Sequence, residues 1–131
     1  MLLGFKKRFV EPILIGTKVH TMRKDRRVQP KIGERLYMYT GLRTSSCQKI
    51  TDKEILISTQ RVHIKGSLNL GVAGMNVWID GRNLSNIEIN EFVKFDGFTD
   101  QTDFASFWLE GKKNGRFAAI LTLYHWTDLR Y

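Results

Sequence analysis

The chain has 131 residues, 42% of them hydrophobic, and its 21 Lys and Arg against 13 Asp and Glu give a formal net charge of +8. This length predicts one domain spanning residues 1–131. No apolar run reaches the roughly 18 residues of a membrane span, and the single cysteine, Cys47, excludes an internal disulfide. Because no cationic region precedes the short apolar start, no signal peptide is predicted and we expect a cytoplasmic protein.

The positive charge is concentrated in the first third of the chain. The basic side chains there are Lys6, Lys7, Arg8, Lys18, Arg23, Lys24, Arg26, Arg27, Lys31 and Arg35, against Glu11, Asp25 and Glu34. A surface built from this segment would attract polyanions, nucleic acid first. The clustering favours a nucleic-acid partner; the alternative is a generally basic protein whose charge only aids solubility.

Residues 13–23, with the sequence ILIGTKVHTMR, predict a short helix, a glycine stop and a strand. Pro12 is tolerated only in the first turn of a helix, so the helix is expected over residues 10–15. Gly16 ends it, because glycine adopts left-handed backbone at little cost. The β-branched residues that follow favour a strand over residues 19–23.

Side chains alternate between the two faces of such a strand. Val19, Thr21 and Arg23 share one face, while Lys18 and His20 share the other. A bend just after the glycine would bring Lys18 round toward Thr21. A lysine beside a threonine hydroxyl suits either contact with a phosphate or activation of the hydroxyl. The alternative is a basic strand facing solvent.

The middle of the chain alternates strands with irregular segments. A basic loop is expected over residues 24–33. Residues 35–40 alternate apolar residues with tyrosines, which predicts a half-buried strand. Residues 54–64 also alternate, with a change of phase that predicts a bulge or a bend. Residues 66–74 are expected to be irregular.

The second half predicts a hairpin, a helix and a final strand. A strand over residues 75–79 leads to Asp80-Gly81, a strong hairpin signal, and the partner strand is expected over residues 84–92. Residues 102–110 carry an apolar stripe and predict a helix, and residues 117–124 predict a buried strand. Two short helices among about six bent strands indicate an α+β fold built on a small mixed β-barrel.

Two motifs resemble the ASCH domain, a family of the PUA-like superfamily. The opening signature of that family is a helix ending in I-x-x-G-x-K-x-x-T-x-R, and its fixed positions are present here as Ile13, Gly16, Lys18, Thr21 and Arg23. The later signature is an acidic residue, a glycine and an aromatic residue, then a helix ending near Phe-Trp. The corresponding residues are Asp96, Gly97, Phe98, Phe107 and Trp108. The similarity covers roughly residues 5–124.

The resemblance implies a PUA-like small mixed β-barrel flanked by two or three short helices, with a basic cleft that accepts RNA or a nucleoside. Some small bacterial ASCH proteins are amidohydrolases that remove the acetyl group from N4-acetylcytidine. Carried over by motif, their catalytic set is Lys18, Thr21 and Asp96. The family has a glutamate at the third position, so the carboxylate of Asp96 is one methylene shorter. This chain also has an additional hairpin around Asp80-Gly81.

Two function classes therefore stay open. The first is an RNA- or nucleotide-binding module that uses the basic cleft. The alternative is an amidohydrolase in which Thr21 supplies the hydroxyl, Lys18 takes its proton, and Asp96 holds or protonates the leaving amine. The residues expected to bind the nucleic acid or nucleoside are Arg23, Arg26, Arg27, Tyr39 and Arg43, with the cations and Lys18 along one face.

No metal and no cofactor are expected. The three histidines, His20, His63 and His125, are scattered, and no His/Cys spacing indicates a metal site. Cys47 has no companion histidine in the sequence and is expected to be a plain thiol. The apolar stripe of residues 104, 107 and 108 is expected to lie in the core. Trp78, like Tyr37 and Tyr39, is an aromatic residue on which a base could stack.

Overall fold

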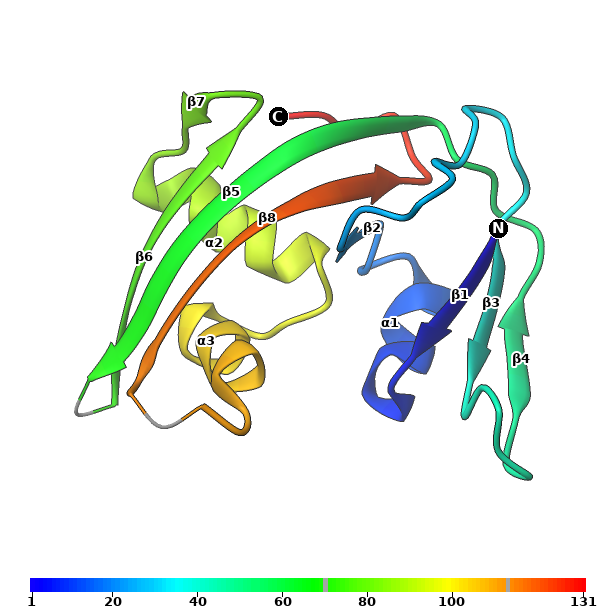
Figure 1. Cartoon of the computed structure of the whole chain (residues 1–131), viewed down its shortest axis with the longest axis horizontal. Coiled ribbons are helices and arrows are strands. Elements are labelled where there is room, and N and C mark those ends of the chain that lie inside the picture. Colours follow the sequence, from blue (N-terminus) through cyan, green and yellow to red (C-terminus); the bar gives the residue numbers. More distant parts are fainter. Residues whose placement is uncertain (70, 113) are drawn as a thin grey trace.

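The computed structural model describes residues 1–69, 71–112 and 114–131. It shows a mixed α+β fold with two sheets (Figure 1). The smaller sheet has the order β1-β3-β4 and consists of β1 (Leu2–Phe5), β3 (Tyr37–Thr40) and β4 (Gln48–Thr51). In this sheet β3 is the central strand: β1 runs parallel to β3, and β4 runs antiparallel to β3.

The larger sheet has five strands in the order β2-β8-β5-β6-β7, and every neighbouring pair is antiparallel. Its strands are β2 (His20–Arg23), β5 (Ser58–Asn69), β6 (Val72–Ile79), β7 (Arg82–Asn83) and β8 (Arg116–His125). The long strands β5 and β8 arch over the helices α2 and α3 (Figure 1). The strands of the described ranges form two separate sheets, without a closed ring of hydrogen-bonded strands.

The helices are short. They are the 3₁₀ turn η1 (Lys7–Phe9) and the α-helices α1 (Val10–Ile15), α2 (Asn86–Phe95) and α3 (Gln101–Leu109). One continuous cluster of buried apolar side chains joins both sheets to α1, α2 and α3. Of the helices in the part of the chain that the structure describes, none has the length and apolar character needed to cross a membrane.

The expected first helix is confirmed. It spans Val10–Ile15 and ends at Gly16, whose φ is +85°. The backbone N–H groups of Thr17 and Lys18 both donate to the carbonyl of Pro12, at 2.9 Å. These bonds turn the chain sharply at the end of the helix, so Lys18 leaves α1 before β2 begins.

The alternation expected around residues 35–40 is also confirmed. Leu36 and Met38 are fully buried, whereas Tyr37 is 42% exposed. The final strand and the last helix lie within a residue or two of their expected limits, at Arg116–His125 and Gln101–Leu109.

The strand predicted over residues 84–92 is wrong, because this segment forms α2. Asp80 and Gly81 both have positive φ and make the expected hairpin turn, but its second strand, β7, ends at Asn83. Ser85 and Glu88 then form a capping box that starts a helix. The apolar residues of α2 that are buried are Ile89, Phe92 and Val93. Their i, i+3, i+4 spacing is helical, and it overrides the short alternation in the sequence.

Two expectations about β5 are also wrong. Residues 66–69 continue the strand and residues 72–74 begin β6, so most of the segment expected to be irregular is regular hairpin; Leu70 lies outside the described residues. No bulge interrupts the pairing of β5 with β8, which runs in continuous register from Ser58 to Ser67, and the strand curves along its length instead (Figure 1). Leu56, Val62 and Ile64 are all fully buried, so even-numbered positions face the core throughout and no change of phase occurs.

Candidate functional site

A pocket of about 280 Å³ opens between the strands β1 and β2 and the helical segments. We call it the Lys18 pocket. Its lining consists of Gly4, Phe5, Lys6, Phe9, Lys18, Thr21, Met22, Arg23, Asp96, Phe98, Phe107 and Trp108. The lining combines aromatic rings with a few polar groups, the usual composition of a small-molecule site. The pocket brings together the three residues carried over as a catalytic set, which the sequence separates by up to 78 positions.

Asp96 is placed by the end of α2. The N–H of Phe98 donates to the carbonyl of Val93, and that of Gly97 to Lys94, both at 3.0 Å, which is the Schellman pattern. Gly97 has a φ of +97°, a conformation that favours glycine. The N–H of Val19 donates to the carbonyl of Phe95 at 2.9 Å. This bond ties the start of β2 to the end of α2, so Lys18 lies directly beside Asp96.

Lys18 is almost completely buried, with 2% of its surface exposed. Its Nζ donates to the backbone carbonyl of Asp96 at 2.5 Å and lies 3.5 Å from a carboxylate oxygen of the same residue. It also lies 4.7 Å from the centre of the Phe9 ring. Burial lowers the pKa of Lys18 to about 8, against the opposing attraction of the Asp96 carboxylate; the nearby Arg23 lowers it further. Lys18 therefore changes its charge near pH 8, well below the range of an exposed lysine.

His20 is the fourth member of this cluster, and the sequence interpretation missed it. Its Nδ1 lies 2.9 Å from the Asp96 carboxylate and its Nε2 lies 2.7 Å from the hydroxyl of Tyr131. Burial lowers the pKa of His20, which keeps the ring neutral. A neutral ring would donate from Nδ1 to the carboxylate and accept from Tyr131 at Nε2. The only sequence signal for this role was its place on the same strand face as Lys18.

Thr21 and Arg23 point from β2 toward the pocket. Thr21 is 6% exposed, and the Arg23 Nε donates to its hydroxyl oxygen at 3.4 Å. The Arg23 guanidinium also donates to the carbonyl of Gly4 at 2.7 Å and lies 4.8 Å from the centre of the Phe5 ring. These contacts hold a cation beside a threonine hydroxyl in partly desolvated surroundings.

A second hollow, of about 500 Å³, shares Gly4 and Arg23 with the Lys18 pocket. We call it the arginine pocket, and its lining is Leu2, Gly4, Arg23, Arg26, Leu42 and Arg43. The Arg26 guanidinium donates to the carbonyl of Leu2 at 2.8 Å. Arg43 sits on the loop after β3 with a φ of +64°. Three of the arginines expected to bind a nucleic acid or nucleoside therefore surround one hollow.

The structure does not bring the whole expected set together. Arg27 is exposed on the loop after β2 and lines neither pocket, and Tyr39 is half-buried on β3 outside both. Lys18 is buried within its pocket, so it does not lie on an exposed basic face with the arginines.

The expectation that residues 104, 107 and 108 all belong to the core is only partly right. Phe104 is fully buried, whereas Phe107 and Trp108 are half-buried and line the Lys18 pocket. The indole N–H of Trp108 is buried and has no hydrogen-bond partner among the described residues. A buried donor without a partner is costly to the fold.

No three His, Cys, Asp or Glu side chains of the described ranges gather in an arrangement that could hold a metal ion. Cys47 is exposed. Comparisons with known proteins add no family to this picture: no protein-family model, no curated protein and no solved structure matches the chain.

Proposed function

We propose that the protein is a small amidohydrolase that holds an N-acylated nucleobase, of the N4-acetylcytidine type, in the Lys18 pocket and hydrolyses its amide bond. The observation that carries this proposal is Lys18 itself. Its pKa is about 8, and it lies in a pocket that also contains the Thr21 hydroxyl. A lysine with a lowered pKa is available as a neutral base near neutral pH, and such groups concentrate at functional sites.

The residues of the Lys18 pocket support a covalent route. Neutral Lys18 takes the proton of the Thr21 hydroxyl, directly or through one water, and the oxygen attacks the amide carbonyl carbon. The C–N bond then breaks, and the Lys18 ammonium returns the proton to the leaving amine. Water hydrolyses the resulting threonine ester, which releases the carboxylic acid and restores Thr21. Arg23, whose Nε lies 3.4 Å from the Thr21 oxygen, stabilises negative charge there.

Asp96 has a different role in this proposal from the one inferred by motif. Its carboxylate contacts His20 at 2.9 Å and Lys18 at 3.5 Å. The short aspartate side chain suits these contacts, which orient the Lys18 amine. Asp96 is therefore a positioning residue that also opposes the lowering of the Lys18 pKa by burial.

The walls of the pocket favour a flat, polar ring as the ligand. Phe5, Phe9, Phe98 and Phe107 supply aromatic surface, and Lys18, Thr21 and Arg23 supply polar groups. A volume of about 280 Å³ accommodates one base with its acyl group and excludes a folded polymer.

The second candidate function is an RNA- or nucleotide-binding module without catalysis. The observation that favours it is the arginine pocket, which adjoins the Lys18 pocket through Gly4 and Arg23. A phosphate attached to a base in the Lys18 pocket would meet Arg23, Arg26 and Arg43.

We propose in addition that the chain is an ASCH-like domain of the PUA-like superfamily, with the two sheets as an opened form of the expected barrel. The support is that both motifs line one pocket. Lys18, Thr21 and Arg23 of the first motif line it together with four residues of the second, Asp96, Phe98, Phe107 and Trp108.

The test of the hydrolase is acetate release from N4-acetylcytidine by the purified protein. Thr21→Ala should lower turnover at least about a thousandfold while leaving the affinity nearly unchanged, because the hydroxyl acts in the chemistry. Lys18→Arg keeps a cation but removes the titratable base, so it should also abolish turnover. Binding is measured separately, by quenching of tryptophan fluorescence.

The matched controls are Thr17→Ala and Lys24→Arg, which change exposed residues outside the Lys18 pocket and should retain full activity. If the parent protein binds the nucleoside but releases no acetate, the binding module is the correct function. If it neither binds nor turns over the nucleoside, both candidates are wrong for this ligand class.

A further inference from the structure

We propose that the outer face of the larger sheet is a second binding surface, for single-stranded nucleic acid, separate from the Lys18 pocket. The surface is formed by the side chains of β5, β6 and β8 that point away from α2 and α3. We call it the outer sheet face, and its residues are His63, Lys65, Ser67, Gly74, Asn76, Trp78, Arg116, Ala118 and Ile120.

The strand register arranges these residues in three rows across the sheet. The first row is Trp78, His63 and Ile120, the second is Asn76, Lys65 and Ala118, and the third is Gly74, Ser67 and Arg116. Rows on one face of a sheet are about 7 Å apart, because they are separated by two residues. The face is therefore a short platform with aromatic groups at one end and cations at the other.

The first row provides surface on which a base can stack. The rings of His63 and Trp78 lie with their centres 5.1 Å apart and their planes inclined by 32°. Beside them, Ile120 is 57% exposed and extends the apolar surface of this row. Aromatic side chains on an open sheet face are the platform on which RNA-recognition domains stack bases.

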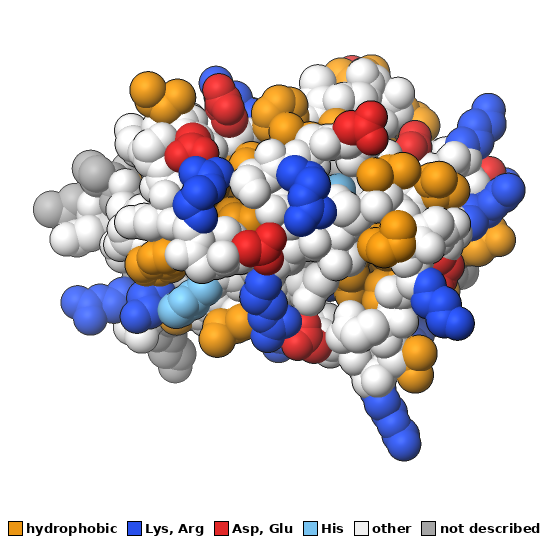
Figure 2. Space-filling view, turned by 90° about the horizontal axis from the view of Figure 1, so that it is seen from above, with side chains coloured by type: hydrophobic (Ala, Val, Ile, Leu, Met, Phe, Trp, Pro, Cys, Tyr) orange, Lys and Arg blue, Asp and Glu red, His pale blue; other side chains and the backbone are white. Residues whose placement is uncertain are grey.

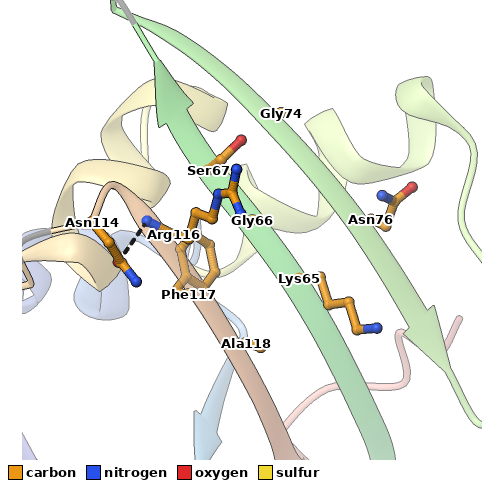
Figure 3. Close-up of a pocket in the computed structure, with 9 residues that line it drawn as sticks. All are labelled: Lys65, Gly66, Ser67, Gly74, Asn76, Asn114, Arg116, Phe117 and Ala118. Atoms are coloured by element: carbon orange, nitrogen blue, oxygen red, sulfur yellow. Dashed lines mark hydrogen bonds between the residues drawn. The ribbon is translucent and has the colours of Figure 1, made fainter.

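The second and third rows line an open hollow of about 490 Å³. Figure 3 shows its lining, with Lys65 on β5 and Arg116 on β8, and with the Arg116 side chain lying across β5 toward Ser67. Neither Lys65 nor Arg116 forms a salt bridge with a carboxylate of the described residues. Two cations with polar neighbours suit the phosphates of a strand.

The positive charge of the outer sheet face favours a nucleic-acid strand as its ligand. The three rows contain no acidic residue. The next row toward β2 is different, because Arg61 there is paired with Asp25 at 2.7 Å. On this face, the cations without an acidic partner therefore lie in the second and third rows. The whole chain carries a net charge of +8. A single strand of nucleic acid complements both ends of the platform. Its bases can stack on the aromatic row, and its phosphates can contact the two cations.

The proposal does not depend on the proposed hydrolase, since its residues lie outside the Lys18 pocket and the arginine pocket. It is tested by fluorescence anisotropy with labelled 12-nucleotide single strands, one of RNA and one of DNA, at several salt concentrations. Trp78→Ala should weaken binding of the strand about tenfold, because one stacked base is lost. Trp78→Phe, which keeps a ring, should restore most of the affinity.

The charged residues are tested through the salt dependence. Lys65→Gln and Arg116→Gln should each reduce the slope of log affinity against log salt by about 0.7, the value for one phosphate of a single strand. The matched control is Lys53→Gln, an exposed lysine after β4 that should leave affinity and slope unchanged. Thermal unfolding of each variant shows that it is folded.

Acetate release by Trp78→Ala should equal that of the parent, so failure of this proposal is distinguishable from failure of the hydrolase. If Lys65→Gln and Lys53→Gln lose the same amount of affinity for the strand, the attraction is diffuse and the proposal is overturned. So would a parent protein that sediments as a dimer and becomes a monomer in Trp78→Ala, because the face would then join two copies. RNA binding without DNA binding, or the reverse, would support the surface and identify the sugar it prefers.

Discussion

At the scale of single residues, the decisive feature is a lysine that the fold holds away from water. Lys18 is 2% exposed, and its amine has the backbone carbonyl and the carboxylate of Asp96 as partners. Desolvation outweighs the attraction of the carboxylate, so the pKa falls from 10.5 to about 8. The neutral amine is thereby available to act as a base.

We expect kcat/KM for N4-acetylcytidine to rise with pH and level off above an inflection near 8, because only the neutral amine accepts the Thr21 proton. Asp96→Asn should move this inflection to lower pH, since the Asp96 carboxylate raises the pKa of Lys18 against the effect of burial. Arg23→Gln should move it to higher pH, since the guanidinium contributes to the lowering. The Lys18 side-chain resonance, followed by NMR, measures the same pKa without turnover. An inflection near 10.5 in both measurements would refute this role for Lys18.

The sign of the effect on stability follows from the same shift. The folded pKa of Lys18 lies below the unfolded value, so between pH 8 and 10.5 the unfolded chain binds more protons. Lys18 therefore makes the free energy of unfolding increase as the pH rises through this window. Denaturant titrations at pH 8 and 9.5 should show the increase in the parent and a smaller one in Lys18→Met.

At the scale of elements, α2 positions the site through both of its ends. Its start is capped by Ser85 and Glu88, and its end is the Schellman turn at Gly97 that places Asp96 beside Lys18. A helix of ten residues is not stable by itself in water, so these caps and its buried face hold it in place.

Replacing the cap tests the start of α2. Ser85→Ala should lower the free energy of unfolding by about 1 kcal/mol, because the N–H of Glu88 loses its acceptor. Urea denaturation measures the loss. Ser106→Ala, an exposed serine inside α3, is the matched control and should change stability by less than about 0.5 kcal/mol. Equal effects of the two substitutions would show that the cap is energetically unimportant.

Replacing Gly97 tests the end of α2. An alanine there would have to adopt the φ of +97° that glycine has. Its Cβ would lie 2.9 Å from the Phe9 ring and 3.0 Å from Cδ of Lys18. Gly97→Ala should therefore cost about 1–3 kcal/mol of stability and reduce turnover by displacing Lys18. Gly33→Ala has a similar φ of +90° and no atom within 4 Å, so it isolates the backbone cost. Gly97→Ala should be the more harmful of the two in both assays.

At the scale of the whole molecule, the positively charged side chains fall into two groups, those paired with carboxylates and those without such a partner among the described residues. In Figure 2, Lys and Arg side chains are spread over the viewed face with acidic side chains between them. Arg61 and Arg82, for example, are paired with Asp25 and Glu88. The arginines around the second pocket are different, because Arg23 and Arg26 donate to backbone carbonyls and form no salt bridge with a described carboxylate. Net charge alone did not show which arginines lack an acidic partner among the described residues.

We expect the 5′-monophosphate of the nucleoside to bind about tenfold more tightly than the nucleoside at low salt, because the phosphate would contact the arginine pocket. The difference should shrink as salt is added. Arg26→Gln and Arg43→Gln should each reduce the difference, and calorimetry measures the affinity of each protein for both ligands. The matched control is Arg27→Gln, which changes an exposed arginine outside both pockets. Equal affinities for nucleoside and monophosphate would exclude a phosphate from the arginine pocket.

Short-range features of the fold followed from the sequence alone. Pro12 and Gly16 defined the limits of α1, and Asp80-Gly81 defined a hairpin turn, because each depends on backbone preferences of one or two residues. The alternation around Met38 predicted which side chains are buried, because the period of a strand is local. The positions Lys18, Thr21 and Asp96 were named differently, through the resemblance of two short motifs to a family signature.

Tertiary structure decided what local preferences leave open. Residues 86–95 alternate weakly, and only the burial of one helical stripe against the core makes them a helix. The pKa of Lys18 depends on contacts with Asp96, 78 positions away, and on the exclusion of water by Phe5 and Phe9. The contacts of His20 with Asp96 and Tyr131 arise in the same way, since hydrogen-bond partners exist only once distant segments have packed together.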